Sequence, residues 1–160
     1  MKTNVEEFLD KNKIKYKKVE HKAVFTVNEA NKLDTSISGV HTKNLFIKDE
    51  KSETYFLVCI VAEKRANLKQ IAKILGVKRL TFAKEEKLME YLGLTPGSVS
   101  IFGLINNKEN NVTLLLDKDI KKAKVVNFHP NINTATLSLT SKEFEKYLKT
   151  FENKVVFKKL

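Results

Sequence analysis

The run Tyr55-Phe56-Leu57-Val58-Cys59-Ile60-Val61 lies near the middle of this 160-residue chain, and its neighbours are best understood from it. Seven consecutive apolar residues, rich in β-branched and aromatic side chains, predict a strand. The run Leu45-Phe46-Ile47 predicts a second strand shortly before it. The polar segment Lys48-Asp49-Glu50-Lys51-Ser52 separates the two runs, so we expect them to form a hairpin.

Helical and strand-like segments follow one another irregularly on both sides of this hairpin. Thr140-Ser141-Lys142-Glu143, for example, has the capping-box pattern that begins a helix. We predict helices over 3–12, 26–33, 67–75, 84–92 and 140–151, strands near 15–20, 44–48, 54–61, 79–82, 112–117, 124–128, 134–139 and 154–157, and another strand-to-strand turn at 106–111. Because strict βαβ alternation is absent, we predict the mixed α/β class, with helices packed on one sheet in a single domain over 1–160.

The single cysteine, Cys59, excludes a disulfide within the chain and a cysteine-rich zinc site. Inside an apolar run, a lone cysteine is expected to behave as a small buried hydrophobe. The first seven residues are polar and acidic, unlike a signal peptide, and no stretch approaches 18 apolar residues. We therefore expect a cytoplasmic protein that does not cross a membrane.

The charge of the chain is strongly positive. Thirty Lys and Arg residues against 19 Asp and Glu give a net charge of +11, which favours a polyanionic partner. Only Arg65 and Arg79 are arginines, and the charge is spread along the chain. A diffuse lysine field suits attraction to a nucleic-acid backbone better than sequence-specific DNA reading, although an ordinary solvated surface explains it equally well.

The usual signatures of metal and cofactor chemistry are missing from the sequence. His21, His41 and His129 do not have metal-ligand spacing, and neither a phosphate-binding glycine loop nor a Gly-x-Ser-x-Gly motif is present. We therefore expect no metal and no cofactor, and an enzyme built on this chain would lack a side-chain nucleophile.

Three polar segments nevertheless have unusual compositions for simple connections. Lys43 follows Gly39 and His41 at the expected mouth of a strand, where an amine could contact a phosphate. The stretch 94–104 combines two glycines, two serines and a proline, so its backbone N–H groups could approach a carbonyl oxygen. His129 precedes a proline turn, where its imidazole could bind a substrate amine or hydroxyl. An exposed lysine, a tight turn and a structural histidine are the alternatives.

Together these segments resemble the YbaK/aminoacyl-tRNA deacylase superfamily. The likeness extends in order over nearly the whole chain, through residues 21–30, 42–49, 92–100 and 128–137. Its most similar branch is the PrdX group, which comprises freestanding relatives of the editing domain of bacterial prolyl-tRNA synthetase. The resemblance implies a YbaK-like single domain with a mixed, mostly antiparallel, barrel-like sheet surrounded by helices.

The resemblance also implies an activity, the hydrolysis of mischarged tRNA(Pro) and above all of alanyl-tRNA(Pro). A site built for proline rejects the smaller alanine weakly, because a missing methylene is worth only about 1–3 kcal/mol. A second site that admits alanine and excludes proline removes the error. The implied partner is the acceptor end of tRNA(Pro), and prolyl-tRNA synthetase is a further candidate. The resemblance implies no binding to DNA.

Individual residues match the family's functional positions. Lys43 matches its important lysine, which we expect to hold the terminal adenosine, and Asn44 is expected to orient the ester. His129 matches the histidine that positions the aminoacyl group. The implied chemistry uses a water activated with help from a ribose hydroxyl of the substrate, since no general base is evident. Lys43 and His129 are thus the catalytic candidates, and the substrate-binding candidates are Thr26, Asn44, Gly97, Ser98, Val99, Ser100, Ile101 and Phe102.

One position departs from the family pattern. The glycine loop commonly reads Gly-x-x-x-Pro, whereas Ile101 occupies the fifth position here. A branched side chain could loosen the loop or enter the pocket, since proline restricts φ and supplies no N–H. Ile101 keeps open a non-catalytic module that binds tRNA or a synthetase. A cysteinyl-tRNA(Pro) deacylase and a general RNA-binding protein are two further alternatives.

Overall fold

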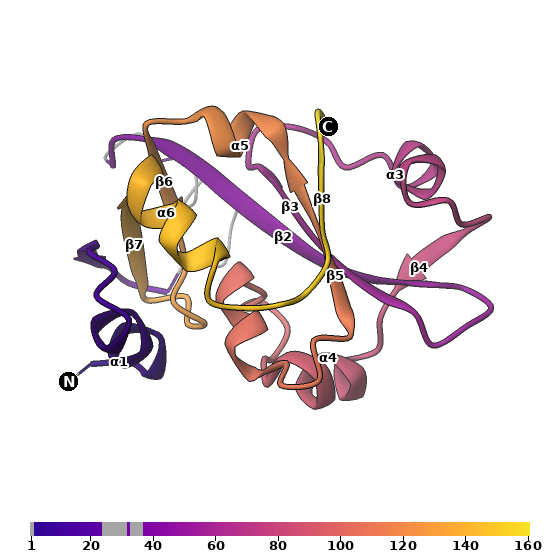
Figure 1. Cartoon of the computed structure of the whole chain (residues 1–160), viewed down its shortest axis with the longest axis horizontal. Helices are drawn as coiled ribbons and strands as arrows, with labels where there is room; N and C mark the ends of the chain where they lie inside the picture. Colours follow the sequence, from indigo (N-terminus) through magenta and orange to yellow (C-terminus); the bar gives the residue numbers. More distant parts are fainter. Residues whose placement is uncertain (1, 24–31, 33–36) are drawn as a thin grey trace.

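The computed structural model describes residues 2–23, 32 and 37–160, and its centre is one mixed sheet (Figure 1). The strands are connected in the order β1-β7-β6-β2-β3-β5-β8, and β4 pairs with β2 outside this path. Four of the pairings between described strands are antiparallel and three are parallel, which confirms the predicted mixed class. The strands are β1 (Lys17–Glu20), β2 (Val40–Asp49), β3 (Tyr55–Val61), β4 (Leu80–Phe82), β5 (Val112–Asp117), β6 (Val125–Phe128), β7 (Ala135–Thr140) and β8 (Val155–Lys158).

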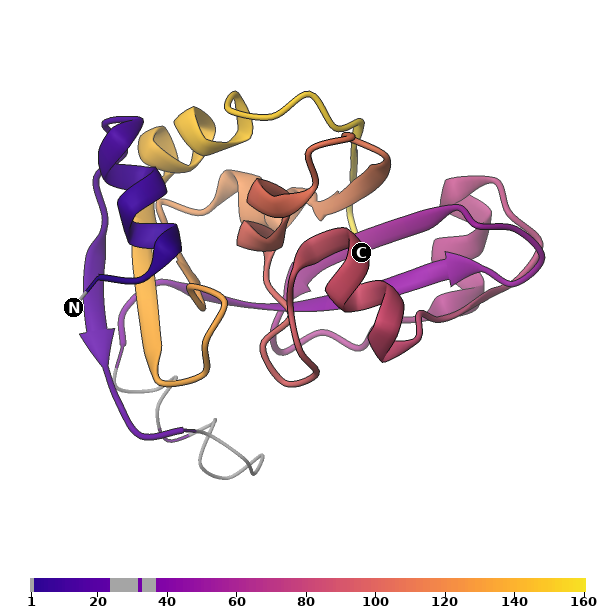
Figure 2. The same ribbon diagram turned by 90° about the horizontal axis from the view of Figure 1, so that it is seen from below.

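Strand β2 joins the two halves of the sheet. Its first residues pair in parallel with β6, and the remainder forms the predicted antiparallel hairpin with β3. Figure 2 shows that β1 and β7 run steeply across the direction of β2 and β3, so β2 passes from one half of a bent sheet to the other. Pairing on both sides extends this strand to Val40, well before the predicted start at residue 44.

Helices cover the sheet, and three of them begin at a side-chain cap, of which those at Asn67 and Thr140 were predicted. Thr3 makes a complete capping box with Glu6, and the side chains of Asn67 and Thr140 accept N–H groups of their helices. The helices are α1 (Asn4–Lys11), α3 (Leu68–Leu75), α4 (Glu85–Leu92), the 3₁₀ helix η1 (Ile101–Asn106), α5 (Lys118–Lys122) and α6 (Ser141–Leu148). Apart from residue 32, the helix predicted over 26–33 lies outside the described residues. Every helix within the described part of the chain is too short or too polar to span a bilayer.

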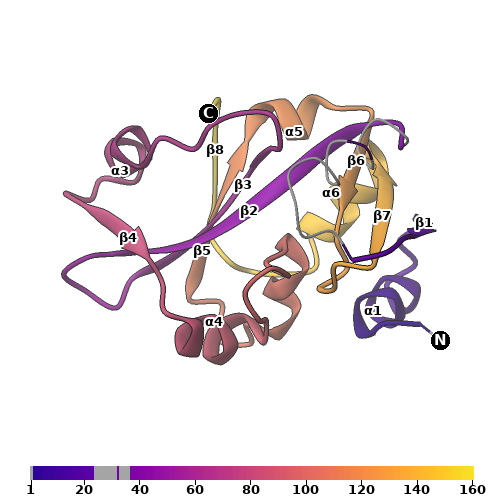
Figure 3. The same cartoon turned by 180° about the vertical axis from the view of Figure 1, so that it is seen from behind.

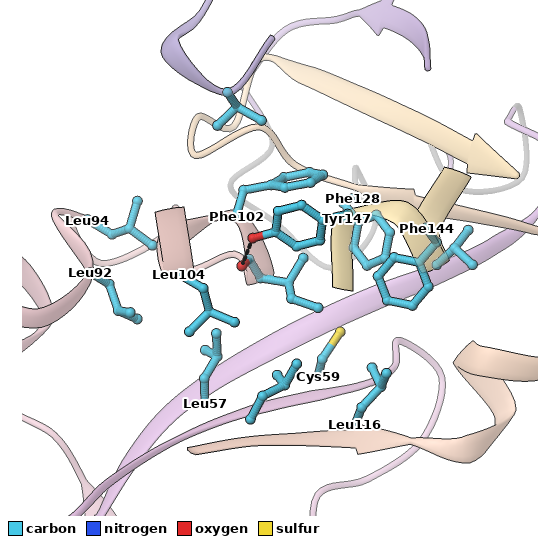
Figure 4. Close-up of a cluster of buried hydrophobic side chains, with 14 of the residues drawn as sticks. Leu57, Cys59, Leu92, Leu94, Phe102, Leu104, Leu116, Phe128, Phe144 and Tyr147 are labelled. Atoms are coloured by element: carbon cyan, nitrogen blue, oxygen red, sulfur yellow. Dashed lines mark hydrogen bonds between the residues drawn. The ribbon is translucent and has the colours of Figure 1, made fainter. Parts of the chain in front are cut away.

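Alternate residues of β3 enter two separate cores. Leu57 and Cys59 pack in the larger core beneath η1 and α6, whereas Val58 and Ile60 pack against α3 on the opposite face. Figure 4 shows the larger core, where the Tyr147 hydroxyl donates a hydrogen bond to the carbonyl oxygen of Ile101 at 2.7 Å. Burial raises the pKa of the Cys59 thiol far above its ordinary value, so this cysteine acts as a core residue.

Two local predictions were wrong. Residues 101–106 form η1, so the segment 106–111 joins a helix to β5 instead of joining two strands. Ser100 caps η1, and the absence of a side chain at Gly103 lets the helix pack closely on Leu94, whose Cδ1 would lie 2.7 Å from an added Cβ. Helix α5 was missed because it contains only five residues.

Candidate functional site

The candidate site begins where β2 and β6 separate. The two strands pair in parallel only at Val40–Val126 and His41–Asn127, and then diverge (Figure 3). Lys43 lies two residues beyond His41, half-buried and paired on its other side with Ile60. It therefore lies inside a strand, and the predicted position at a strand mouth was wrong.

Lys43 and His129 stand on opposite sides of this opening. Each lies two residues past the last β2–β6 pair, and within a strand residues two apart project from the same face. The Nε2 atom of His41 lies 3.4 Å from Nδ2 of Asn127, which shows that the two paired side chains share one face. By alternation, Lys43 projects from that face of β2. His129 directly follows β6, two residues past Asn127.

The imidazole of His129 belongs to a group of polar side chains on this face. Its Nδ1 lies 3.2 Å from the carbonyl oxygen of Ala135, and its ring centre lies 6.4 Å from that of His21. His21 in turn contacts the Thr136 hydroxyl on β7 at 3.0 Å. One side of the sheet thus carries three histidines that are widely separated in sequence, His21, His41 and His129.

The predicted glycine loop adjoins this group. Ser98 N–H bonds to the carbonyl oxygen of Thr95 at 3.1 Å, and Gly97 has φ +87°, which glycine adopts without strain. The buried Ser100 hydroxyl donates to the carbonyl oxygen of His129 at 2.6 Å. The loop and the histidine segment, which sequence reasoning treated separately, are therefore directly connected.

The side chains of Ile101 and Phe102 do not fit the predicted role of lining a pocket. Both are fully buried in the larger core. Ile101 is the first residue of η1, a position at which helices tolerate proline because the N–H lacks an intrahelical acceptor. The isoleucine side chain therefore lies in the core, at a helical position that requires no intrahelical N–H acceptor.

Asn44 faces the other side of β2 from Lys43. It pairs with Cys59, and its Oδ1 atom is buried without a hydrogen-bond donor within the described residues. A buried acceptor of this kind is suited to a donor supplied by a ligand. Thr26, the remaining substrate-binding candidate, lies outside the described residues.

Positive charge accumulates on the face of the sheet that Lys43 shares with α3. Residues 62–79 contain six basic residues against Glu63, a net charge of +5, and include both arginines. Ile71 of α3 packs in the same core as Ile60, the partner of Lys43. The Lys64 ammonium bonds to Asp117 and Asp119 at 3.0 and 2.6 Å. Partial burial would lower the pKa of Lys64, but these carboxylates outweigh it and raise the pKa.

Sequence reasoning overlooked Asn127. It is a buried amide in the otherwise apolar strand Val125-Val126-Asn127-Phe128. The sequence signal for it was a polar residue between valine and phenylalanine at a strand position. For metals, the described residues contain no group of three or more His, Cys, Asp and Glu side chains that could hold an ion.

This mixed sheet surrounded by helices is the architecture of an editing domain. The chain belongs to the aminoacyl-tRNA editing domain family, whose model matches residues 21–147. The predicted enzyme class, an aminoacyl-tRNA deacylase, agrees with this membership.

Particular relatives narrow the comparison. Prolyl-tRNA editing protein ProX of Acetoanaerobium sticklandii is 37% identical over 145 residues, covering 91% of this chain and 88% of that protein. Prolyl-tRNA synthetase associated domain-containing protein 1 of Danio rerio is 34% identical over 150 residues, covering 92% and 81%. A crystal structure of a protein suggested to be a trans-editing enzyme for prolyl-tRNA synthetase matches the fold with TM-score 0.73 and 21% identity, covering 100% and 99%.

Proposed function

We propose that this protein hydrolyses mischarged tRNA(Pro) in trans and that alanyl-tRNA(Pro) is its main substrate. The observation that carries the proposal is the placement of Lys43 and His129 on either side of the opening between β2 and β6, with the glycine loop bonded to the histidine segment. The ProX relative, named for prolyl-tRNA editing, supports the choice of tRNA. A cytoplasmic location and an association with prolyl-tRNA synthetase belong to the same proposal.

Orientation and charge stabilisation supply the catalysis in this proposal. The Lys43 ammonium attracts the terminal nucleotide, and His129 orients the aminoacyl group. Backbone N–H groups of Gly97, Val99 and Ser100 donate to the ester carbonyl as it gains negative charge in the transition state, since the N–H of Ser98 already bonds to Thr95. A water attacks this carbon with the help of a ribose hydroxyl of the substrate, and the ester oxygen of the ribose leaves. Fixing these groups together replaces the strong base that the site lacks.

Size selects the amino acid in this proposal. The amino acid is proposed to bind beside the glycine loop, at a site that admits alanine and excludes the larger pyrrolidine ring of proline. Cysteine is of intermediate size and carries a thiol, so cysteinyl-tRNA(Pro) is the alternative substrate. The basic segment 62–79 lies on the same face of the sheet as Lys43 and attracts the phosphates of the acceptor stem.

A deacylation panel tests the proposal. Alanyl-, cysteinyl-, seryl- and prolyl-tRNA(Pro) are incubated with purified protein, and the release of each amino acid is followed against the spontaneous rate. We expect alanine to be released fastest and proline to be retained. Equal release of alanine and proline, or release at the spontaneous rate, would contradict the proposal, and salt-sensitive tRNA binding without turnover would indicate the non-catalytic module.

Two lysine variants on one strand make the panel specific. We expect Lys43→Ala to remove most of the activity. Lys48→Ala provides the matched control, because Lys48 lies on the same strand and pairs with Glu53 in the hairpin, away from the opening. Equal losses in the two variants would show that general charge, and not Lys43, supports the reaction.

A further inference from the structure

Asn127 connects the three strands that surround the candidate site through its side-chain amide and its backbone carbonyl. Its Nδ2 donates to the carbonyl oxygen of Ser38 at 2.8 Å, just before β2 begins. Its Oδ1 accepts a hydrogen bond from the Ser138 hydroxyl on β7. Its backbone carbonyl accepts the Thr42 hydroxyl at 2.8 Å. One residue thus links β6 to β2 on one side and to β7 on the other.

The position of Asn127 along the strand gives these bonds their significance. Asn127 and His41 form the last pair of the parallel ladder before β2 and β6 separate. Thr42, which bonds to Asn127, directly precedes Lys43, while His129 lies two residues beyond Asn127. Any change in the spacing of the strands at this pair therefore alters the distance between Lys43 and His129.

The packing around this amide leaves little room for adjustment. The side chain of Asn127 is 2% exposed, and Gly39 approaches so closely that an added Cβ would lie 3.0 Å from its Nδ2. Gly39 also has φ +106°, which disfavours any other residue. The contact with Ser38 requires an N–H at this site, because two carbonyl-type oxygens would repel each other at 2.8 Å.

From this geometry we propose that Asn127 is a positioning residue, which sets the separation of Lys43 and His129 without touching the substrate. The inference rests on the proposed deacylase function. A displacement of about 1 Å between reacting groups can lower a rate about 100-fold. The catalytic constant should therefore fall while the affinity for tRNA, which depends on a broad charged surface, stays nearly constant.

Three variants test this role through single-turnover and steady-state deacylation of alanyl-tRNA(Pro). Asn127→Ala removes all side-chain bonds. Asn127→Asp keeps the shape but puts an oxygen against the Ser38 carbonyl, and Ser138→Ala removes only the bond to Oδ1. We expect kcat to fall about 10- to 100-fold for both Asn127 variants and less for Ser138→Ala, with KM within about threefold of the wild-type value.

Two further measurements separate positioning from general stability. Asn153→Ala removes an equally buried amide that bonds to Asn107 and Val112, at the far end of the sheet, and should lower the unfolding midpoint without lowering kcat. In a Lys43→Arg background, Asn127→Ala should lower kcat less than about threefold, because the effects of substitutions at coupled residues do not add.

The possible results have distinct meanings. A kcat loss confined to the Asn127 and Ser138 variants, and reduced in the Lys43→Arg background, supports the role. The role is overturned if the wild-type protein is active and the Asn127 variants are fully active, or if KM alone changes. It is also overturned if Asn127→Ala lowers kcat equally in the wild-type and Lys43→Arg backgrounds. If Asn127→Ala does not fold, Asn127→Asp and Ser138→Ala decide the question. A wild-type protein that releases neither alanine nor cysteine from tRNA(Pro) overturns the deacylase function itself, and this role with it.

Discussion

The Ser100 hydroxyl donates a 2.6 Å hydrogen bond to the carbonyl oxygen of His129, joining two segments that lie 29 residues apart. The same hydroxyl accepts the N–H of Phe102 at 3.1 Å and so begins η1. Ser100 therefore fixes the end of the glycine loop against the turn that carries the candidate imidazole. Its side chain is fully buried and its bonding capacity is used within the protein, so its role in the proposed site is to hold the loop.

Ser100→Ala should weaken both the fold and the reaction. It leaves the His129 carbonyl and the Phe102 N–H without this partner in a buried environment, which costs about 2 kcal/mol. We expect urea unfolding to show that loss and kcat for alanyl-tRNA(Pro) to fall about 10-fold. Ser52→Ala is the control, because the Ser52 hydroxyl is also hydrogen-bonded but lies in the β2–β3 hairpin. An unchanged kcat in Ser100→Ala would show that the loop does not depend on this bond.

Ile101→Pro should be tolerated. The residue begins η1, and Ser100 before it is extended, with φ −149° and ψ 151°, as the residue preceding a proline requires. The smaller side chain loses about 1 kcal/mol of burial, part of which is offset by a less disordered unfolded chain. We expect deacylation within about threefold of the wild-type rate.

Phe102→Pro, one residue further on, gives the contrast. It removes the N–H that bonds to Ser100 and also an aromatic ring from the larger core, so we expect a loss of several kcal/mol in the free energy of unfolding. Denaturant titration of the two variants measures the difference. Equal destabilisation would mean that Ile101 does not occupy the first helical position as described.

Charge reversal on the α3 side should weaken tRNA binding more than reversal on the opposite side. Lys69→Glu and Lys78→Glu change exposed residues of the basic segment, whereas Lys142→Glu and Lys149→Glu change exposed residues beside α6, which packs on the other face. Each lost phosphate contact lowers the slope of log affinity against log salt concentration by about 1. Binding isotherms at several salt concentrations measure this slope, and equal slopes for both pairs would assign the tRNA to neither face.

Glu6→Gln should lower stability in a pH-dependent manner. Burial alone would raise the pKa of the Glu6 carboxyl, but its bonds to Lys18 and Thr3 outweigh this and lower it. A lowered pKa in the folded state contributes stability above the unfolded pKa, and this contribution is lost as the pH falls through the folded pKa. We expect Glu6→Gln to cost about 1 kcal/mol at pH 7 and progressively less below pH 4.

Thermal unfolding of the wild-type and Glu6→Gln proteins between pH 3 and pH 8 measures this convergence. Lys2 and Asp10 form an exposed ion pair at the same helix, so Asp10→Asn is the matched control and should change stability little. A constant difference between wild type and Glu6→Gln at all pH values would show that the carboxylate charge does not contribute.

Local patterns were sufficient to predict most secondary structure. The positions of β3, of its hairpin with β2 and of the capped helices depend on runs of apolar residues and on hydrogen bonds between residues three or four apart, which the sequence shows directly. The motif around Lys43 and the segment around His129 could likewise be recognised, because the residues that define each of them are adjacent in the chain.

The tertiary structure alone decided how those pieces form a site. The parallel pairing of His41 with Asn127 joins residues 86 positions apart, and nothing in either segment specifies that register. Strand pairing also moved Lys43 into the interior of β2, and core packing turned Ile101 away from the loop surface. In the sequence, Asn127 differed from its neighbours only as a polar residue within an apolar strand. Only the approach of three strands, driven by burial of their apolar faces, gives its amide a function in placing the two candidate residues.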